Sequence, residues 1–249
     1  MKVAAILNGL PRSYKKTYES FRSMFGNQEV DVFVYAWNEF YDPCSMRDAY
    51  ARLYYAYDPE DVYVGDYSKV DPKLAERAKV LETMRPKRER KPNYSLKTGL
   101  LAQYYTIKKA YELIPDPDAY DIILRIRFDL KPLFTMEWKE CRRWVQEGVC
   151  YSNQRENGLK KKGLAINDLF IVANPANFKV YVQLFDIMMK TDKYFDAIKA
   201  YNCTVPEFIL AYHLKASGVK KKACPFPYEL HHKRDLYLTP TGPVYIKDG

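Results

Sequence analysis

The sequence lacks most of the short motifs that would identify its chemistry directly. It contains neither GxGxxG nor GxxxxGK[ST], so the common glycine-rich loops of dinucleotide-binding and P-loop proteins are absent. Its five cysteines are widely spaced and include no CxxC pair, which argues against a zinc site and for free thiols in a reducing compartment. The apolar start at residues 2–7 is too short for a signal-peptide core, and no later run approaches a membrane span. We therefore expect a cytoplasmic protein.

The composition is that of a soluble globular protein with an excess of positive charge. The 249 residues are enough for one large α/β domain or two small ones, and 47% of them are hydrophobic. The net charge of +9 favours an anionic partner, which could be nucleic acid, a phosphorylated small molecule or a membrane surface. Much of the excess lies in the runs 85–91, 160–162 and 220–222, which we expect to be solvated loops. The 23 tyrosines suit stacking on sugars or bases, but they are equally common as core filler.

Residues 121–132 predict a strand, because apolar and charged residues alternate along them. One face would carry Ile122, Leu124, Ile126, Phe128 and Leu130, and the other Asp121, Ile123, Arg125, Arg127 and Asp129. We expect Pro132, which cannot donate to a ladder, to end the strand and leave Asp129 near its carboxyl end, where open α/β sheets bind ligands. The alternative is that Arg125, Arg127 and Asp129 only neutralise one another. We expect instead that Asp129 lies at a ligand site and outside any structural ion pair.

The amino-terminal half alternates strands and helices, which predicts an α/β fold with a mostly parallel sheet. The expected strands are 2–7, 30–36 and 61–64, and the expected helices are 13–25, 45–57, 72–84 and 95–113. Gly9 lies in the first turn and Arg12 where the first helix begins, so the helix amino end and a guanidinium could together hold a phosphate. A plain turn is the alternative.

The second half is richer in predicted helices and contains two acidic candidates. The expected helices are 137–146, 175–189, 194–200 and 206–217, and the expected strands are 149–151, 169–173, 219–223 and 227–230. Asp168 precedes a buried strand and would lie at the edge of a cleft, unless it is a turn residue. Glu207 lies in the first turn of a helix, where the helix dipole alone would favour it. All three histidines, His213, His231 and His232, fall in this last region.

Four segments in order, 5–14, 31–38, 120–129 and 167–170, resemble a family of glycosyltransferase-like proteins. Members of that family occur in surface-polysaccharide gene clusters and in large DNA viruses, and they are similar to GT-A enzymes. The resemblance implies a single GT-A-like domain with a helical carboxyl-terminal part. Residues 1–132 would bind a nucleotide-sugar donor and residues 133–249 the acceptor. The location would be the cytoplasm, or the host cytoplasm if the protein is viral.

The resemblance also implies a metal held by an Asp-x-Asp signature after the central strand, where this chain has Arg127-Phe128-Asp129. The substitution leaves dependence on Mn²⁺ or Mg²⁺ open, because an arginine can neutralise part of a diphosphate charge itself. Asp129 and His232 are the candidate metal ligands. The candidate donor-binding residues are Gly9, Arg12, Arg125, Arg127 and Asp129. Asp168 is the first candidate for general base and Glu207 the second.

Together these features predict transfer of a sugar from a nucleotide diphosphate to an acceptor hydroxyl of a glycan. A basic nucleic-acid-binding protein is one alternative, but the basic runs lie in separate predicted loops and no recognised nucleic-acid module is present. A catalytically inactive GT-A-like binding module is another, since the Asp-x-Asp signature is broken.

Overall fold

A seven-stranded sheet forms the centre of the computed structural model, which describes residues 1–38, 45–83, 99–152, 166, 168–190, 206–231, 237–239 and 242–244. The strand order is β3-β2-β1-β4-β7-β6-β8. The strands are β1 (Val3–Gly9), β2 (Asp31–Trp37), β3 (Asp61–Gly65), β4 (Ile122–Arg127), β6 (Val149–Ser152), β7 (Phe170–Ala173) and β8 (Lys221–Cys224). Every strand runs parallel to its neighbour except β7, which is antiparallel to both β4 and β6. The predicted α/β class with a mostly parallel sheet is confirmed.

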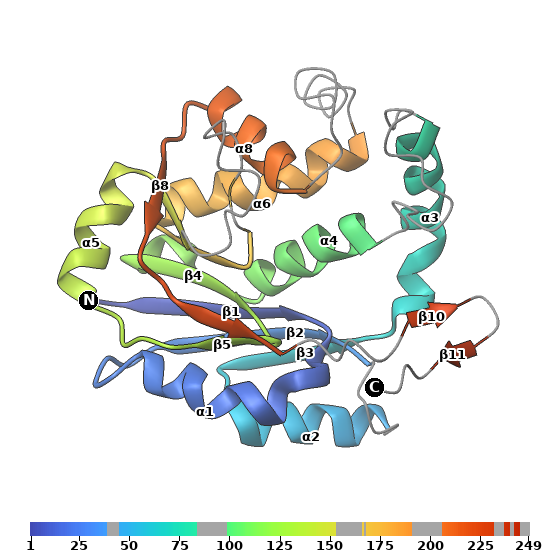
Figure 1. Ribbon diagram of the computed structural model, residues 1–249, viewed down its shortest axis with the longest axis horizontal. Helices are drawn as coiled ribbons and strands as arrows, with labels where there is room; N and C mark the ends of the chain where they lie inside the picture. Colours follow the sequence, from blue (N-terminus) through green and yellow to red (C-terminus); the bar gives the residue numbers. More distant parts are fainter. Residues whose placement is uncertain are drawn as a thin grey trace, which may run out of the picture.

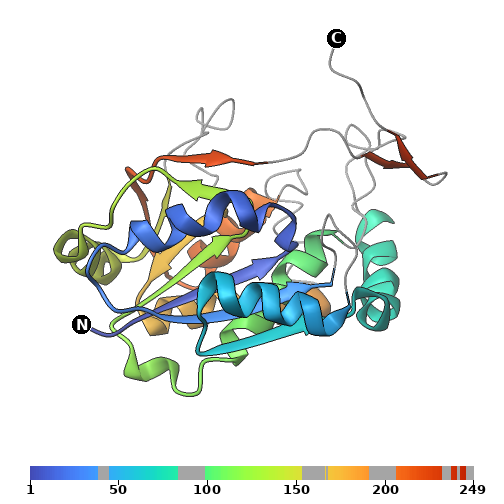
Figure 2. The same ribbon diagram turned by 90° about the horizontal axis from the view of Figure 1, so that it is seen from below.

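Helices cover both faces of this sheet (Figure 1). One face is covered by α4 (Gly99–Glu112), α6 (Pro175–Lys190) and α8 (Pro206–Ala216). The other is covered by α1 (Tyr14–Met24), α2 (Met46–Tyr57) and α5 (Trp138–Glu147). Figure 2 shows α1 and α2 lying across this second face. A further helix, α3 (Tyr67–Thr83), contacts α4, and short 3-10 turns occupy Pro11–Ser13 and Pro117–Ala119.

Alternation along β4 divides the core as predicted. Ile122, Leu124 and Ile126 belong to the core under α1 and α2, whereas Ile123 belongs to the core under α4 and α6. Arg125 shares the parity of Ile123, and its side chain accordingly lies on the α4 side. The residues on each face of this strand were therefore predicted correctly from the sequence.

The end of the central strand is a correction to the sequence prediction. β4 stops at Arg127, Phe128 and Asp129 form a turn, and β5 (Leu130–Pro132) pairs with β9 (Tyr228–Leu230) in a separate two-stranded sheet. The Thr17 hydroxyl of α1 donates to the Phe128 carbonyl at 2.6 Å, at the point where the chain leaves the central sheet.

Two further boundaries differ from the prediction. α3 begins at Tyr67 and contains Pro72 in its interior, whereas the expected helix began at that proline. Lys221 and Lys222 lie in β8 and pair with Val149 and Cys150, which confirms the expected strand 219–223 but contradicts the expectation that the basic run 220–222 is a solvated loop. Pairing with β6 evidently outweighs the local charge. The runs 85–91 and 160–162 and the expected helix 194–200 lie outside the described residues. A small hairpin, β10 (Tyr237–Thr239) with β11 (Gly242–Val244), lies near the carboxyl end.

The described cysteines are reduced, as expected. Cys141, Cys150 and Cys224 are buried free thiols, and burial raises the pKa of Cys141 to about 12. Among the helices that the structure describes, none combines the length and hydrophobicity of a membrane span.

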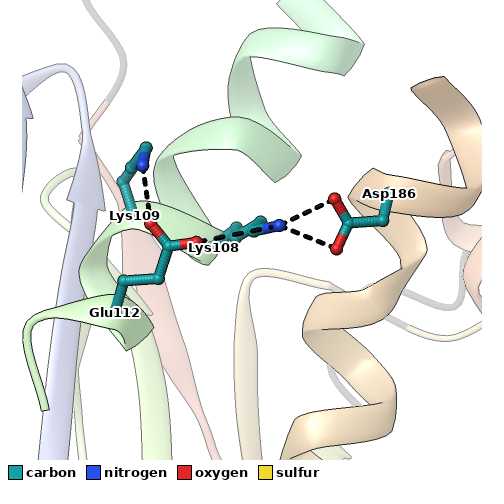
Figure 3. Close-up of polar contacts among 4 residues, drawn as sticks. All are labelled: Lys108, Lys109, Glu112 and Asp186. Atoms are coloured by element: carbon teal, nitrogen blue, oxygen red, sulfur yellow. Dashed lines mark hydrogen bonds and ion pairs between the residues drawn. The ribbon is translucent and has the colours of Figure 1, made fainter. Parts of the chain in front are cut away.

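An ion pair joins α4 to α6 on the helical face of the sheet (Figure 3). The Lys108 ammonium lies 2.7 Å from both carboxylate oxygens of Asp186 and 3.7 Å from Glu112, which also pairs with Lys109. About a quarter of the Lys108 side chain and a third of the Asp186 side chain are exposed, so the pair contributes little free energy. Buried apolar side chains hold α4 beside α6, and the Thr106 hydroxyl of α4 reaches Asn8 near the end of β1.

Candidate active site

The carboxyl ends of β1 and β4 meet at one edge of the sheet. Asn8 lies opposite Arg127 in the parallel register, and Gly9 is the last residue of β1. Gly9 has a φ of 109°, a conformation that side-chain-bearing residues rarely adopt, and, among the described residues other than its two chain neighbours, none has an atom within 4 Å of where a Cβ would stand. The chain then turns through Pro11–Ser13 into α1, with Arg12 in that turn. Open space at Gly9 and the start of α1 are compatible with the predicted phosphate site.

Arg125 is completely buried beneath this edge. Its Nε donates to Asn8 Oδ1 at 2.7 Å, and Asn8 Nδ2 donates to the Thr106 hydroxyl of α4 at 2.8 Å. Neither terminal nitrogen of the guanidinium has a hydrogen-bond partner among the described residues. A buried cation with two nitrogens lacking protein acceptors would require water or a ligand group, because leaving them unsatisfied is costly. Its predicted contact with a donor stays a prediction.

Arg127 and Asp129 form a two-point ion pair across the turn that ends β4. Arg127 Nε donates to Asp129 Oδ1 at 2.9 Å and its terminal nitrogen to Oδ2 at 2.6 Å. The expectation that Asp129 lies outside an ion pair is therefore wrong. Arg127 and Asp129 are two residues apart and lie on the same side of the chain, as the alternation predicted, so the alternative of mutual neutralisation holds for this pair. The Arg127 side chain is 29% exposed and the Asp129 side chain is 13% exposed, so the ion pair borders the protein surface and a ligand can reach it.

Asp168 reaches the same edge because β7 is reversed. Ile126 near the end of β4 pairs with Phe170 at the start of β7, so the turn that enters β7 lies beside the segment that leaves β4. Asp168 is 4% exposed, and one of its carboxylate oxygens accepts a hydrogen bond from the Gln103 amide of α4. The Asp168 carboxylate is therefore buried and hydrogen-bonded.

Glu207, in the first turn of α8, completes an acidic pair with Asp168. Burial, followed by the negative charge of Asp168, raises the pKa of Glu207 to about 7. Its Oε2 is buried and has no hydrogen-bond partner in the described part of the chain. Two tyrosines complete the surroundings, and burial raises the pKa of Tyr104 and of Tyr181 above the usual phenol range. A carboxyl group that titrates near neutral pH inside a polar cluster is typical of acid–base sites.

The predicted site residues thus separate into two groups. The structure brings Arg125, Arg127, Asp129, Asp168 and Glu207 to one edge, with Gly9 at the end of the adjacent strand. The Arg12 side chain and all of His232 lie outside the described part. The preceding residue, His231, is fixed at this edge, because its backbone N–H donates to the Asp129 carbonyl at 2.9 Å and its carbonyl accepts from the Ser13 hydroxyl at 2.6 Å.

Sequence reasoning missed Asn8 and Gln103. Gln103 did leave a signal, since it is a polar residue within the stripe formed by Leu100, Tyr104 and Ile107 on a predicted helix. Asn8 ends a fully buried strand and carries a polar group into the core, where it must find partners.

A metal at Asp129 would have to compete with Arg127, which occupies both carboxylate oxygens. Within the described ranges no group of three or more His, Cys, Asp or Glu side chains has the spacing to hold a metal ion. The predicted ligand pair of Asp129 and His232 therefore stays a prediction.

Comparison with known proteins shows the fold of the chain but not its family. No family model matches the chain, and no curated protein matches it. The structure is similar to that of mouse xyloside xylosyltransferase 1, with 10% sequence identity over 90% of this chain and 84% of that one and a TM-score of 0.53. It is also similar to the glycosyltransferase GlyE of Streptococcus pneumoniae, at 8% identity and a TM-score of 0.44, over 90% of this chain and 45% of that one. The likeness to the mouse enzyme shows a fold that glycosyltransferases use.

Proposed function

We propose that the protein is a glycosyltransferase that moves a sugar from a nucleotide-diphosphate donor to an acceptor hydroxyl of a glycan. The observation that carries the proposal is the meeting of arginine side chains from β4 with the Asp168–Glu207 acidic pair at one edge of the sheet. Transfer requires both, since the diphosphate that leaves gains negative charge and the acceptor hydroxyl loses a proton. The fold likeness to a xylosyltransferase supports the same class of reaction.

The donor would lie against the ends of β1 and β4, within residues 1–132. Gly9 allows a phosphate to approach the backbone closely, and Arg12 and Arg127 would neutralise the diphosphate. Arg125 would act from beneath, where its buried charge strengthens the positive potential at the edge. The acceptor would bind mainly to residues 133–249, with its reactive hydroxyl directed to the acidic pair.

A divalent cation, Mn²⁺ or Mg²⁺, would neutralise the diphosphate when bound, with Asp129 and His232 as its ligands. Binding it would require Asp129 to release Arg127, which would then be available to the donor. We place the reaction in the cytoplasm, or in the host cytoplasm if the protein is viral, and assign the chain to surface-polysaccharide synthesis or its viral counterpart.

A catalytically inactive binding module is the second candidate function. The two-point pair between Arg127 and Asp129 favours it, because both groups satisfy each other without a donor or a metal. Such a module would bind a nucleotide sugar and release it unchanged.

Nucleotide sugars added to the folded protein test the proposal. At about 100 times its dissociation constant, a ligand stabilises the native state by about 2.7 kcal/mol, which raises the Tm of a chain of this size by roughly 5–10 °C. We expect a uridine or guanosine diphosphate sugar to do so, and released nucleoside diphosphate to be detectable by chromatography once an acceptor is supplied. Arg127→Ala should lose the stabilisation, whereas Arg143→Ala, on the exposed side of α5, should keep it. Stabilisation by short nucleic acid that resists salt, with none by any nucleotide sugar, would refute the proposal.

A further inference from the structure

A cavity of about 610 Å³ lies at the edge of the sheet opposite the candidate active site. It lies where β6 and β8 begin, since Val149 and Lys221, the first residues of these parallel strands, are paired. The end of α5, the first turn of α6 and the segment that follows α8 surround it (Figure 1). Its volume is in the usual range for sites that bind small molecules.

Backbone contacts hold the segment that carries the basic run 220–222 on both sides of the cavity. The Val149 N–H donates to the Lys220 carbonyl at 2.9 Å, and a Cβ on Gly148 would clash with that carbonyl oxygen. Position 148 therefore requires glycine, because the two backbones approach so closely there. Where the chain passes from α8 to β8, the Val219 N–H donates to the Leu214 carbonyl at 2.8 Å. The lysines therefore project from a fixed backbone.

The cavity carries an excess of positive charge. Lys220, Lys221 and Lys222 line it, together with Glu147, so its described lining has a formal excess of two positive charges. The Lys222 ammonium lies 2.6 Å from the Glu147 carboxylate and 5.9 Å from the centre of the Trp144 ring. This ion pair forms one wall of the cavity. We call the site the basic cavity.

Neutral donors complete the lining of the basic cavity. Gln146 at the end of α5 and Asn177 in the first turn of α6 contribute side-chain amides, which can donate hydrogen bonds. Lys220 is exposed, whereas Lys221 and Lys222 are half-buried. Potential donors from α5, α6 and β8 thus line a single cavity that a ligand can enter.

This lining suits a phosphate group better than a carboxylate. A lysine ammonium is a compact charge with three donors, and it is a common ligand of phosphate in proteins. A phosphate monoester carries about −1.5 to −2 charges near pH 7 and has three acceptor oxygens, which matches an excess of two positive charges beside several donors. A carboxylate offers a single charge and two oxygens.

We infer that the basic cavity binds a phosphate group, which could belong to a soluble phosphate ester or to a lipid headgroup. The basic run supplies the charge, and the amides of Gln146 and Asn177 supply neutral hydrogen bonds. The inference does not rest on the proposed function, because the cavity and the candidate active site lie at opposite edges of the sheet. It also gives a role to a basic run that the proposed function does not use.

Titration of the whole chain with methyl phosphate, followed by ¹H–¹⁵N NMR, tests the inference. In about 150 mM NaCl the Debye length is about 8 Å, so attraction to the overall positive charge of the protein is largely screened. We expect the backbone amide signals of Gly148, Gly218 and Val219 to shift and to saturate. These signals separate the basic cavity from the turn at Gly9, where the predicted phosphate site lies.

Acetate provides a comparison within the wild-type protein. It should bind the basic cavity about tenfold more weakly or worse, since it forms fewer hydrogen bonds to charged groups. Shifts that grow with methyl phosphate but do not saturate would overturn the inference. Equal affinity for acetate and methyl phosphate would overturn it as well.

A pair of double variants tests the lysines. Lys220→Gln combined with Lys221→Gln should weaken methyl phosphate binding about tenfold or more, the usual effect of losing a hydrogen bond to a charged group. The matched control is Lys73→Gln combined with Lys79→Gln, which removes the same charge from exposed positions of α3 and should leave the affinity unchanged. An equal loss of affinity in both double variants would show that net charge alone attracts the ligand, and would refute the site.

Vesicles distinguish the two sources of the phosphate. Sedimentation of the protein with phosphatidylcholine vesicles that contain phosphatidic acid, but not with phosphatidylcholine alone, would support a lipid headgroup if methyl phosphate releases the protein. Saturable NMR shifts without sedimentation would support a soluble ester. Sedimentation that the Lys220→Gln and Lys221→Gln double variant leaves unchanged would exclude the basic cavity as the lipid site.

Discussion

Replacing Glu207 by glutamine should stabilise the protein at alkaline pH and leave its stability unchanged at acidic pH. The carboxyl group has a pKa of about 7 in the folded chain and an ordinary value of 4.5. A raised carboxyl pKa means that the native state binds the proton more tightly than the unfolded state does. The contribution to stability is therefore complete below about pH 4.5 and is lost as the pH rises towards 7. Above pH 7 the native protein carries an ionised carboxylate in an unfavourable place.

The size of the effect follows from the shift. Each pKa unit corresponds to about 1.4 kcal/mol, so the ionised group costs at most about 3 kcal/mol, and partial solvent access reduces this to about 1–3 kcal/mol. Glutamine keeps the shape of the neutral carboxyl group and cannot ionise. For a chain of this length the gain corresponds to a Tm higher by roughly 2–10 °C at pH 8.

Thermal unfolding followed by circular dichroism at pH 4.5 and pH 8 measures this difference. Glu140→Gln, on the exposed side of α5 and paired with Arg143, is the matched control and should change Tm little at either pH. Comparing the variant with the wild type at the same pH cancels the titration of groups that the substitution does not affect, so the change in that difference between the two pH values reports on Glu207. An equal Tm change at both pH values, or a lower Tm at pH 8, would contradict a buried Glu207 that titrates near neutrality.

Three other substitutions probe the rest of the edge. Arg125→Lys keeps the buried charge but loses the bond from Nε to Asn8, so urea unfolding should show a loss of about 1.5–3 kcal/mol, the usual value for a hydrogen bond to a charged group. Gly9→Ala forces a side chain into a φ of 109°, and because nothing crowds the new Cβ the loss should be that of backbone strain alone, about 1–3 kcal/mol by the same assay. Asp129→Asn releases Arg127 from its ion pair, so isothermal titration without metal should show a donor affinity equal to or higher than that of the wild type. Adding Mn²⁺ should then raise the donor affinity of the variant no further. If Mn²⁺ raises the donor affinity of the variant as much as that of the wild type, Asp129 is excluded as a metal ligand.

Local patterns predicted the elements of this fold well. The alternation of side chains along residues 122–127 predicted the strand and both of its faces correctly. Successive side chains of a strand point to opposite faces, so the residues of the second face are known once the apolar face is identified. The sequence predicted α1, α2, α5, α6 and α8 to within a few residues. In each case the deciding information lies within the segment itself.

The errors arose where distant segments decide. The chain leaves the central sheet at Phe128, whose carbonyl accepts a hydrogen bond from Thr17 of α1. The strand at 219–223 was predicted, but its lysines were also expected to lie in a solvated loop, and they pair with β6 instead. The site shows the same division. Asp168 and Glu207 could be selected by residue type, but the burial of Arg125 depends on Asn8 and Thr106 from two other elements. The bond between Gln103 and Asp168 joins residues that no local pattern relates.

The reversed direction of β7 has a consequence for how the protein can be altered. Because β6 and β7 are antiparallel neighbours, residues 153–169 only have to join two adjacent strand ends, a task that a two-residue hairpin can perform. The connection starts and ends at the edge of the sheet where Asp168 lies, and it includes Ile166, which is buried in the core and bonded to the Glu207 carbonyl. Loop length affects stability only logarithmically. The length and charge of residues 153–165 can therefore be changed at little cost in stability, provided that Ile166 and Asp168 are kept.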